Sequence, residues 1–245
     1  GTGVFLCENL KSDVCRFTDW CDGIEETVHL NVYGLPEGEV QVIDIVGDLG
    51  GFAFTQMDQP CSNSFADEEG NRYITCINAD FSDIHPENVV VTPRGNWKGK
   101  TKGGLIFSKD YGLTFERIPL PFGISDYLDV RFHEIECPSV NSGWVSLSAD
   151  AKTIVYCVAE GIDLFMKGII VSHDQGKSFQ KVRIFDEEGA ELSDTDCHMK
   201  VFSDRVNSQL FYGFGDDFSM YISKDWGNTF YPAKTEGIPG GKMNF

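Results

Sequence analysis

One eight-residue pattern, present three times, constrains the fold of this chain more than any other feature. The pattern is Ser-x-Asp-x-Gly-x-Ser/Thr-Phe, and its copies are Ser108–Phe115, Ser172–Phe179 and Ser223–Phe230. The copies begin 64 and 51 residues apart, and each follows a short apolar run that reads as a strand. Repeats of this length are typical of modules that stack small β-sheets side by side. The sequence therefore predicts an all-β chain built from repeated sheets.

The chemistry of the pattern is that of a hairpin turn. The aspartate can accept backbone N–H groups within the turn, the glycine takes a positive φ angle, and the Ser or Thr begins the returning strand. The aromatic residue then anchors that strand in the core. The pattern resembles the Asp-box (BNR-like) repeat of β-propellers. We therefore expect Asp110, Asp174 and Asp225 to be structural rather than catalytic.

The length of the chain limits how many sheets it can form. At roughly 50–60 residues for each propeller blade, 245 residues supply about four blades. Blades of this length are more common in larger rings. We therefore expect residues 1–245 to be a propeller segment of a longer protein, or a half that pairs with another chain.

Charge and composition exclude several classes of partner and cofactor. The net charge of −18 argues against nucleic acid and against anionic membranes, because both select basic surfaces. A neutral polymer such as a polysaccharide, or a cationic ligand, stays possible. No apolar run is long enough to span a membrane, and no signal peptide is evident at the first residues. The five histidines show no paired spacing, so no metal and no cofactor is expected.

The cysteines bear on the compartment. Eight cysteines occur without a Cys-x-x-Cys pair, which weakens a zinc interpretation. Their even number and scattered spacing favour disulfides in a secreted protein, and buried free thiols in a cytosolic protein are the alternative.

A single carboxylate surrounded by glycines is the candidate catalytic feature. The segment Gly47–Phe52 reads Gly-Asp-Leu-Gly-Gly-Phe and follows the alternating apolar run Val40–Val46, which predicts a strand. Gly50 and Gly51 beside Asp48 would let a ligand approach the backbone closely. A carboxylate at the end of a strand is a plausible site of acid–base chemistry. The alternative is a tight turn in which Asp48 binds its own backbone.

Two motifs at a defined spacing identify a family. The segment Asp22–Val28 reads Asp-Gly-Ile-Glu-Glu-Thr-Val, and Gly47–Phe52 follows about twenty residues later. This pair is similar to the second domain of the glycoside hydrolase family 74 xyloglucanases. The opening residues 1–3 and two later segments, 146–156 and 203–213, are similar to further stretches of that family, in the same order.

The resemblance implies the second of two propellers in an enzyme that cleaves the β-1,4-glucan backbone of xyloglucan between its domains. The family inverts anomeric configuration with one aspartate from each domain, and Asp48 matches the aspartate of the second domain. The other aspartate is expected on an upstream propeller that this chain does not contain. The resemblance therefore implies that the segment is inactive alone. No nucleic acid and no membrane is expected as a partner.

One departure from the family concerns the residues after the glycine pair. The family usually continues with Arg-His-Asp-Asp after the phenylalanine, whereas this chain has Ala53-Phe54-Thr55-Gln56. If the polar residues orient substrate or tune the aspartate, this protein differs in substrate or is impaired. The next carboxylate, Asp58, does not match in register.

Aromatic side chains are the expected sugar-binding groups, because their faces stack on pyranose rings. The first candidate is Trp97, in a Gly- and Lys-rich loop, followed by Tyr127, Trp144 and Tyr156. For Arg205 we expect a structural ion pair with Asp204 or with a neighbouring blade. A function of a different class stays open: a non-catalytic propeller that binds glycans, or a sortilin-like receptor ectodomain.

Overall fold

The computed structural model describes residues 4–21, 27–61, 63–95, 103–121, 143–158, 168–193, 199–215 and 219–237. These residues form β-strands and turns and contain no helix. The described part of the chain consequently holds no helical segment of the length and apolarity that crossing a bilayer requires. The predicted all-β class is confirmed.

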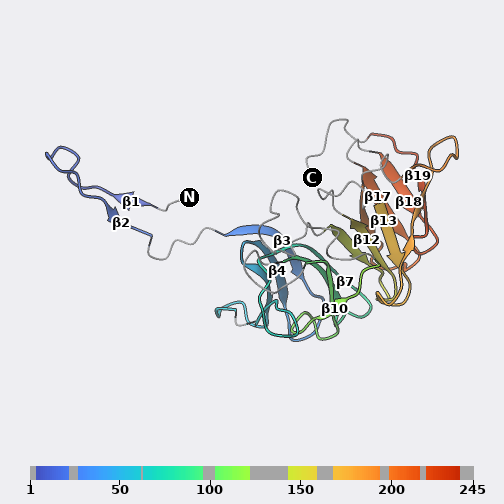
Figure 1. The fold of residues 1–245 in the computed structure, drawn as a ribbon, viewed down its shortest axis with the longest axis horizontal. Helices are drawn as coiled ribbons and strands as arrows, with labels where there is room; N and C mark the ends of the chain where they lie inside the picture. Colours follow the sequence, from blue (N-terminus) through green and yellow to red (C-terminus); the bar gives the residue numbers. More distant parts are fainter. Residues whose placement is uncertain are drawn as a thin grey trace.

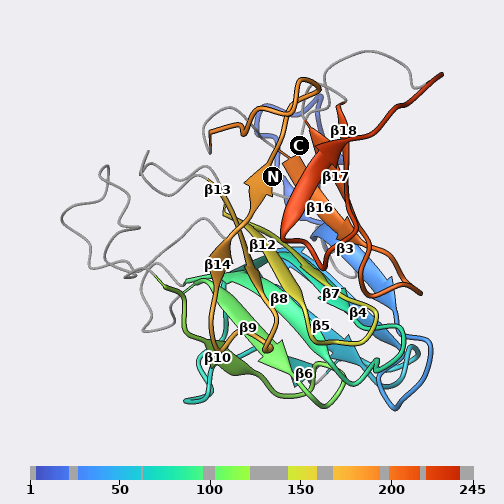
Figure 2. The same cartoon turned by 90° about the vertical axis from the view of Figure 1, so that its right-hand side faces the viewer.

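Sixteen of the strands form four successive groups of four antiparallel strands, here called blades (Figures 1 and 2). One parallel pair, Gly50 with Thr75, joins the first two blades into an eight-stranded sheet. Blade 1 contains β3 (Val28–Gly34), β4 (Val42–Gly47), β5 (Gly50–Phe54) and β6 (Asn63–Ser64). Blade 2 contains β7 (Thr75–Phe81), β8 (Val89–Arg94), β9 (Leu105–Ser108) and β10 (Glu116–Ile118). Blade 3 contains β11 (Trp144–Leu147), β12 (Ile154–Val158), β13 (Gly168–Ser172) and β14 (Gln180–Lys181). Blade 4 contains β16 (Met199–Ser203), β17 (Phe211–Gly215), β18 (Met220–Ser223) and β19 (Thr229–Pro232).

Three short strands lie outside this pattern. The strand β15 (Arg183–Ile184) pairs in parallel with β19 and so ties blade 3 to blade 4. The strands β1 (Phe5–Leu6) and β2 (Thr18–Asp19) form a hairpin that lies apart from the blades in Figure 1. The blades themselves follow one another in chain order, because β7 contacts β3, β11 contacts β7, and β16 contacts β11.

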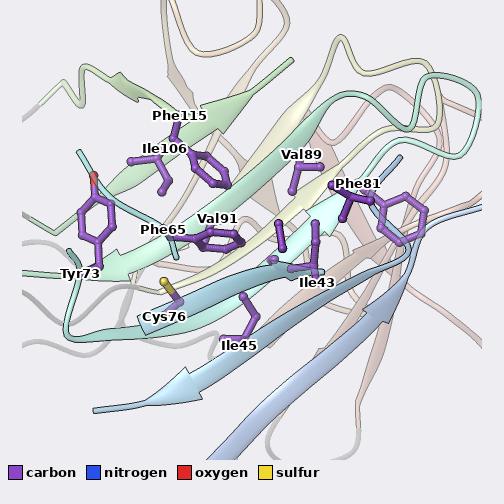
Figure 3. Packing of buried hydrophobic residues seen from close by; sticks show 13 residues of the cluster. Ile43, Ile45, Phe65, Tyr73, Cys76, Phe81, Val89, Val91, Ile106 and Phe115 are labelled. Atoms are coloured by element: carbon purple, nitrogen blue, oxygen red, sulfur yellow. The ribbon is translucent and has the colours of Figure 1, made fainter. Parts of the chain in front are cut away.

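The core is divided among the seams between successive blades. The cluster between blades 1 and 2 includes Ile43 and Ile45 of β4, which face Val89 and Val91 of β8 (Figure 3). The intervening Val90 points to the opposite face of β8 and joins the cluster between blades 2 and 3. Because both faces of β8 are buried here, the strand begins with three consecutive valines rather than with an alternating pattern.

The three repeated turns have one hydrogen-bonding arrangement. In the first, Ser108 Oγ donates to Asp110 Oδ1 at 2.7 Å, and Thr114 donates to the same carboxylate through its N–H at 2.9 Å and its hydroxyl at 2.5 Å. The Gly112 N–H donates to Ser108 Oγ at 2.8 Å. Equivalent bonds hold Asp174 and Asp225. These aspartates are structural, as the sequence predicts.

The glycines of the second and third repeated turns also set the spacing between blades. Gly227 has φ of 79°, and a Cβ built on it would lie 2.6 Å from Val155 Cγ2 of blade 3. Gly176 approaches Ile118 of blade 2 equally closely. Any side chain here would push two blades apart, so the pattern needs glycine for packing as well as for conformation.

A buried carboxylate joins three blades near their inner strands. Asp80 of β7 accepts the Leu147 N–H of blade 3 at 2.8 Å and the Ser203 hydroxyl of blade 4 at 3.2 Å. The Arg205 guanidinium of blade 4 lies 2.7 Å from Asp80 Oδ1 and also donates to the Phe81 carbonyl at 2.9 Å. Burial raises the pKa of Asp80 despite these donors. Arg205 therefore forms its ion pair with Asp80 of blade 2 rather than with Asp204.

The cysteines differ from the expected disulfide framework. Among the described residues, Cys7, Cys15, Cys21, Cys61 and Cys76 carry free thiols. Cys76 is buried in the core between blades 1 and 2, and its burial raises the pKa of the thiol. Cys137 and Cys197 lie outside the described residues.

Candidate functional site

Asp48 lies at the tip of the hairpin that joins β4 to β5. The last pair of the hairpin ladder is Val46 with Gly50, so the tip consists of residues 47–49. Asp48 has φ of 63°, in the left-handed region that non-glycine residues other than Asn and Asp seldom occupy. Its N–H donates to Thr75 Oγ1 of blade 2 at 2.9 Å. The tip is therefore fixed to the adjacent blade through its backbone.

The carboxylate of Asp48 is exposed, and among the described residues it has no hydrogen-bonding or ionic partner. This differs from the alternative in which the side chain binds its own backbone. It also contrasts with Asp110, Asp174 and Asp225, whose oxygens are all held by donors in their turns. Asp48 is thus available to a ligand or to another part of the protein.

The two glycines after Asp48 are required by packing. Gly50 has φ of 92°, and a Cβ on it would lie 2.6 Å from the Tyr73 carbonyl oxygen. A Cβ on Gly51 would lie 2.3 Å from the Phe65 ring. Both glycines are buried, so these contacts explain why glycine is needed at the two positions without invoking a ligand. The substrate-binding role that we expect for them from the sequence stays a prediction.

Asp48 lies at the end of the strands opposite to the repeated turns. Its N–H contacts Thr75, where β7 begins, whereas β7 ends at Phe81. The repeated turn of blade 2 is bonded to the turn after β7, through the Tyr111 N–H and the Glu87 carbonyl at 3.0 Å. The molecule therefore has an Asp48 end and a repeated-turn end.

The structure separates the aromatic candidates. Trp144 is half-buried at the start of β11, where its indole N–H donates to the Val201 carbonyl at 3.0 Å. The Lys200 ammonium lies 4.3 Å from its ring centroid, and Phe202 packs edge-on against it at 5.3 Å. One face of this ring is therefore already covered by a cation.

Tyr156 does not meet the expectation of a substrate-binding side chain. It is only 1% exposed and belongs to the core between blades 2 and 3. Its hydroxyl accepts the Gly143 N–H at 3.3 Å. The alternation of β12 places this ring on the face that packs against blade 2, whereas Val155 faces blade 4, so the Tyr156 ring serves packing. Trp97 and Tyr127 lie outside the described residues, as do Glu25 and Glu26 of the first family motif.

The segment that departs from the family is part of the blade. Ala53 is fully buried in the core between blades 1 and 2, and the Phe54 ring packs near Phe52 with a centroid separation of 6.4 Å. Thr55 is half-buried and Gln56 follows it beyond the end of β5. The first two of these positions thus carry apolar packing groups.

A hydrogen-bonded chain near the Asp48 tip was not expected from the sequence. His29 Nδ1 lies 2.9 Å from the carboxylate of Asp44, and His29 Nε2 lies 2.7 Å from Thr27 Oγ1. Thr27 directly precedes β3, whose first residue, Val28, pairs with Gly47. These bonds fix the imidazole on β3, where His29 pairs with Val46 of β4. The one available signal is Asp44, a lone charge in the apolar run Val40–Val46.

No cluster of His, Cys, Asp and Glu suited to a metal ion occurs within the described ranges. At Asp48 itself the described residues present an exposed carboxylate on a tip whose backbone is fixed.

Comparisons with known proteins agree with the resemblance. No family model matches the chain. The chain is 24% identical over 217 residues to a xyloglucanase from a Paenibacillus species. The matched region is 89% of this chain and 18% of that protein.

Solved structures share the fold. The glycoside hydrolase family 74 xyloglucanase of Xanthomonas campestris matches 94% of this chain with a TM-score of 0.62 and 22% identity. The family 74 enzyme of Niastella koreensis matches 94% with a TM-score of 0.58 and 19% identity. The chain covers 28% and 27% of these two proteins.

The chain therefore spans less than a third of each of these relatives. Its propeller fold is that of the family 74 enzymes, and its sequence is similar to that of a xyloglucanase along most of its length. These findings agree with the resemblance stated above: the chain is similar in sequence to a segment of a xyloglucanase and in fold to a segment of the glycoside hydrolase family 74 enzymes.

Proposed function

We propose that this chain supplies one catalytic carboxylate, Asp48, to a secreted, inverting hydrolase of xyloglucan or a related β-1,4-glucan. The observation that carries the proposal is the exposed Asp48 carboxylate, which has no partner among the described residues although its backbone is fixed. A rigid loop with a free functional group is what catalysis requires, because positioning contributes much of the rate.

The second carboxylate belongs to an upstream propeller domain. An inverting glycosidase needs two carboxyl groups about 6.5–9.5 Å apart, one as general acid and one as the base that activates water. Asp44 does not fill this role, because its carboxylate is buried and bonded to His29. Support for a further domain comes from the relatives, of which this chain covers less than a third.

The stereochemistry of the first product tests the proposal. The protein with its upstream propeller is incubated with xyloglucan, and the anomeric protons are followed by NMR before mutarotation. Inversion of a β-linkage releases the α anomer first, and the 245-residue chain alone releases no reducing ends. Initial release of the β anomer, or hydrolysis by the isolated chain, would contradict the proposed division of the active site.

A further inference from the structure

A cavity of about 390 Å³ lies between blades 3 and 4 at the repeated-turn end, away from Asp48. Its wall comes from the β11–β12 turn and from the repeated turns of blades 3 and 4. The lining residues are Asp150, Lys152, Thr153, His173, Trp226 and Asn228. This volume is within the range of small-ligand sites, about 300–1,000 Å³.

Trp226 supplies an aromatic surface to this cavity. Its side chain is 42% exposed, although nearby apolar residues of blades 3 and 4 are buried. The residue has φ of 59°, and its N–H donates to the Gln209 carbonyl at 3.0 Å. The indole is therefore mounted on a backbone that the repeated turn holds rigid.

The polar side chains around Trp226 are already ordered. His173 Nε2 lies 2.8 Å from Asn228 Oδ1, and His173 Nδ1 lies 3.3 Å from Thr153 Oγ1. The Asp150 carboxylate accepts the Ser148 hydroxyl at 2.8 Å. Lys152 extends into solvent 3.5 Å from the other oxygen of Asp150. His173 and Asn228 are thus held by bonds within and beside the lining. The Lys152 ammonium and the Asp150 carboxylate keep hydrogen-bonding capacity beside the aromatic ring.

Comparison of the repeats shows that this cavity is particular to one seam. Tyr111 and Gln175 occupy the position of Trp226 in the other two repeated turns. The Tyr111 ring lies against Gly38, where a Cβ would be only 2.3 Å from a ring carbon, so that seam is filled. Gln175 donates its amide to the Ala151 carbonyl at 3.1 Å within its own blade. The fold does not require an exposed aromatic residue at this position.

We propose that the cavity is a second saccharide site, which stacks a neutral sugar ring on Trp226 and binds its hydroxyls through Asp150 and Lys152. One aromatic face beside five hydrogen-bonding side chains suits a sugar better than an apolar peptide, because the lining contains no aliphatic side chain. The acidic chain disfavours anionic sugars. The choice of a β-1,4-glucan as ligand rests on the proposed function.

Titration calorimetry of the 245-residue chain with cellohexaose tests the site. The variant Trp226→Gln takes the residue found at this position in blade 3, which tolerates the same backbone conformation. We expect the Kd to rise about tenfold or more on loss of the stacking surface. The matched control is Trp20→Gln, because Trp20 is 61% exposed in the hairpin β1–β2, outside the cavity. Its Kd should equal that of the unaltered chain.

A second variant, Asn228→Lys, takes the residue that follows the glycine in blade 3 and should also weaken binding. Circular dichroism establishes that each variant is folded. An unchanged Kd in both variants, an equal loss in Trp20→Gln, or no heat with about 10 mM cellohexaose would overturn the site. Binding of a proline-rich peptide without binding of cellohexaose would overturn it in favour of a peptide site. Hydrolysis with inversion can persist in all these cases, so failure here is distinct from failure of the Asp48 proposal.

Discussion

At the scale of single residues, the aspartates of turns fall into two groups: those of the repeated turns are held by hydrogen bonds, and Asp48 is exposed. In the sequence, the repeat is what distinguishes the two groups. Asp110, Asp174 and Asp225 are predictable as turn residues because the same pattern occurs three times. Asp48 has no such repeat, and only its glycines and the paired family motif single it out. The burial of Tyr156 was less predictable, because the same aromatic residue suits a core and a cleft.

Asp174 should make stability depend on pH. Its bonds from the Ser178 hydroxyl, the Ser178 N–H and Ser172 lower its pKa to about 2, against about 3.9 in an unfolded chain. The stabilisation is thus complete above about pH 4 and is lost as the pH falls through about 2. Replacement by Asn should cost about 1 kcal/mol at pH 7, as for a lost capping side chain, with solvent screening limiting the effect.

Urea unfolding of Asp174→Asn at pH 7 and pH 3 measures this difference. The deficit relative to the unaltered protein should shrink at the lower pH. Asp58→Asn is the control, because Asp58 is an exposed aspartate outside the repeated turns. A deficit that stays constant with pH would show that the charge of Asp174 is not what stabilises the turn.

At the scale of elements, the strands are predictable and the links between them are not. The apolar runs that precede the repeated turns become β9, β13 and β18, and the run from Val40 becomes β4. The contacts of Asp80 join residues 67 and 123 positions away in the sequence. No local pattern encodes such partners, because the stacking of blades determines which residues meet.

Arg205→Met tests the link among blades 2, 3 and 4. The change leaves the buried Asp80 carboxylate without its cation, and we expect destabilisation of about 3 kcal/mol at pH 7. Burial already raises the pKa of Asp80, and loss of Arg205 raises it further. The deficit should therefore decrease toward pH 4, as the carboxyl group takes up a proton.

The comparison variant is Arg183→Met, which removes an exposed ion pair with Glu191 at 2.9 Å and should change stability little. Thermal or urea unfolding at pH 7 and pH 4 measures both variants. Equal effects of the two replacements would contradict a structural role for the buried pair.

At the scale of the whole molecule, the four successive blades have two ends, one with Asp48 and one with the repeated turns. The fold class and the approximate number of blades follow from the repeat, because its spacing fixes how much chain each blade consumes. The separation of the Asp48 end from the repeated-turn end becomes evident only once strand pairing is known. The cavity at Trp226 could not be predicted either, because the other two residues at this repeat position behave differently. Tyr111 packs against Gly38, and Gln175 bonds to the Ala151 carbonyl of its own blade.

We propose that Asp48 performs chemistry, whereas the aspartates of the repeated turns maintain the fold. The most direct measurement is the rate at which reducing ends appear from xyloglucan for Asp48→Asn, in the protein that includes the upstream propeller. Asp58→Asn, ten residues after Asp48 in the same blade, is the matched control. We expect kcat to fall by about a hundredfold or more for Asp48→Asn, as for loss of a general acid or base, with the control unaffected. A rate for Asp48→Asn equal to that of the unaltered protein would contradict the account.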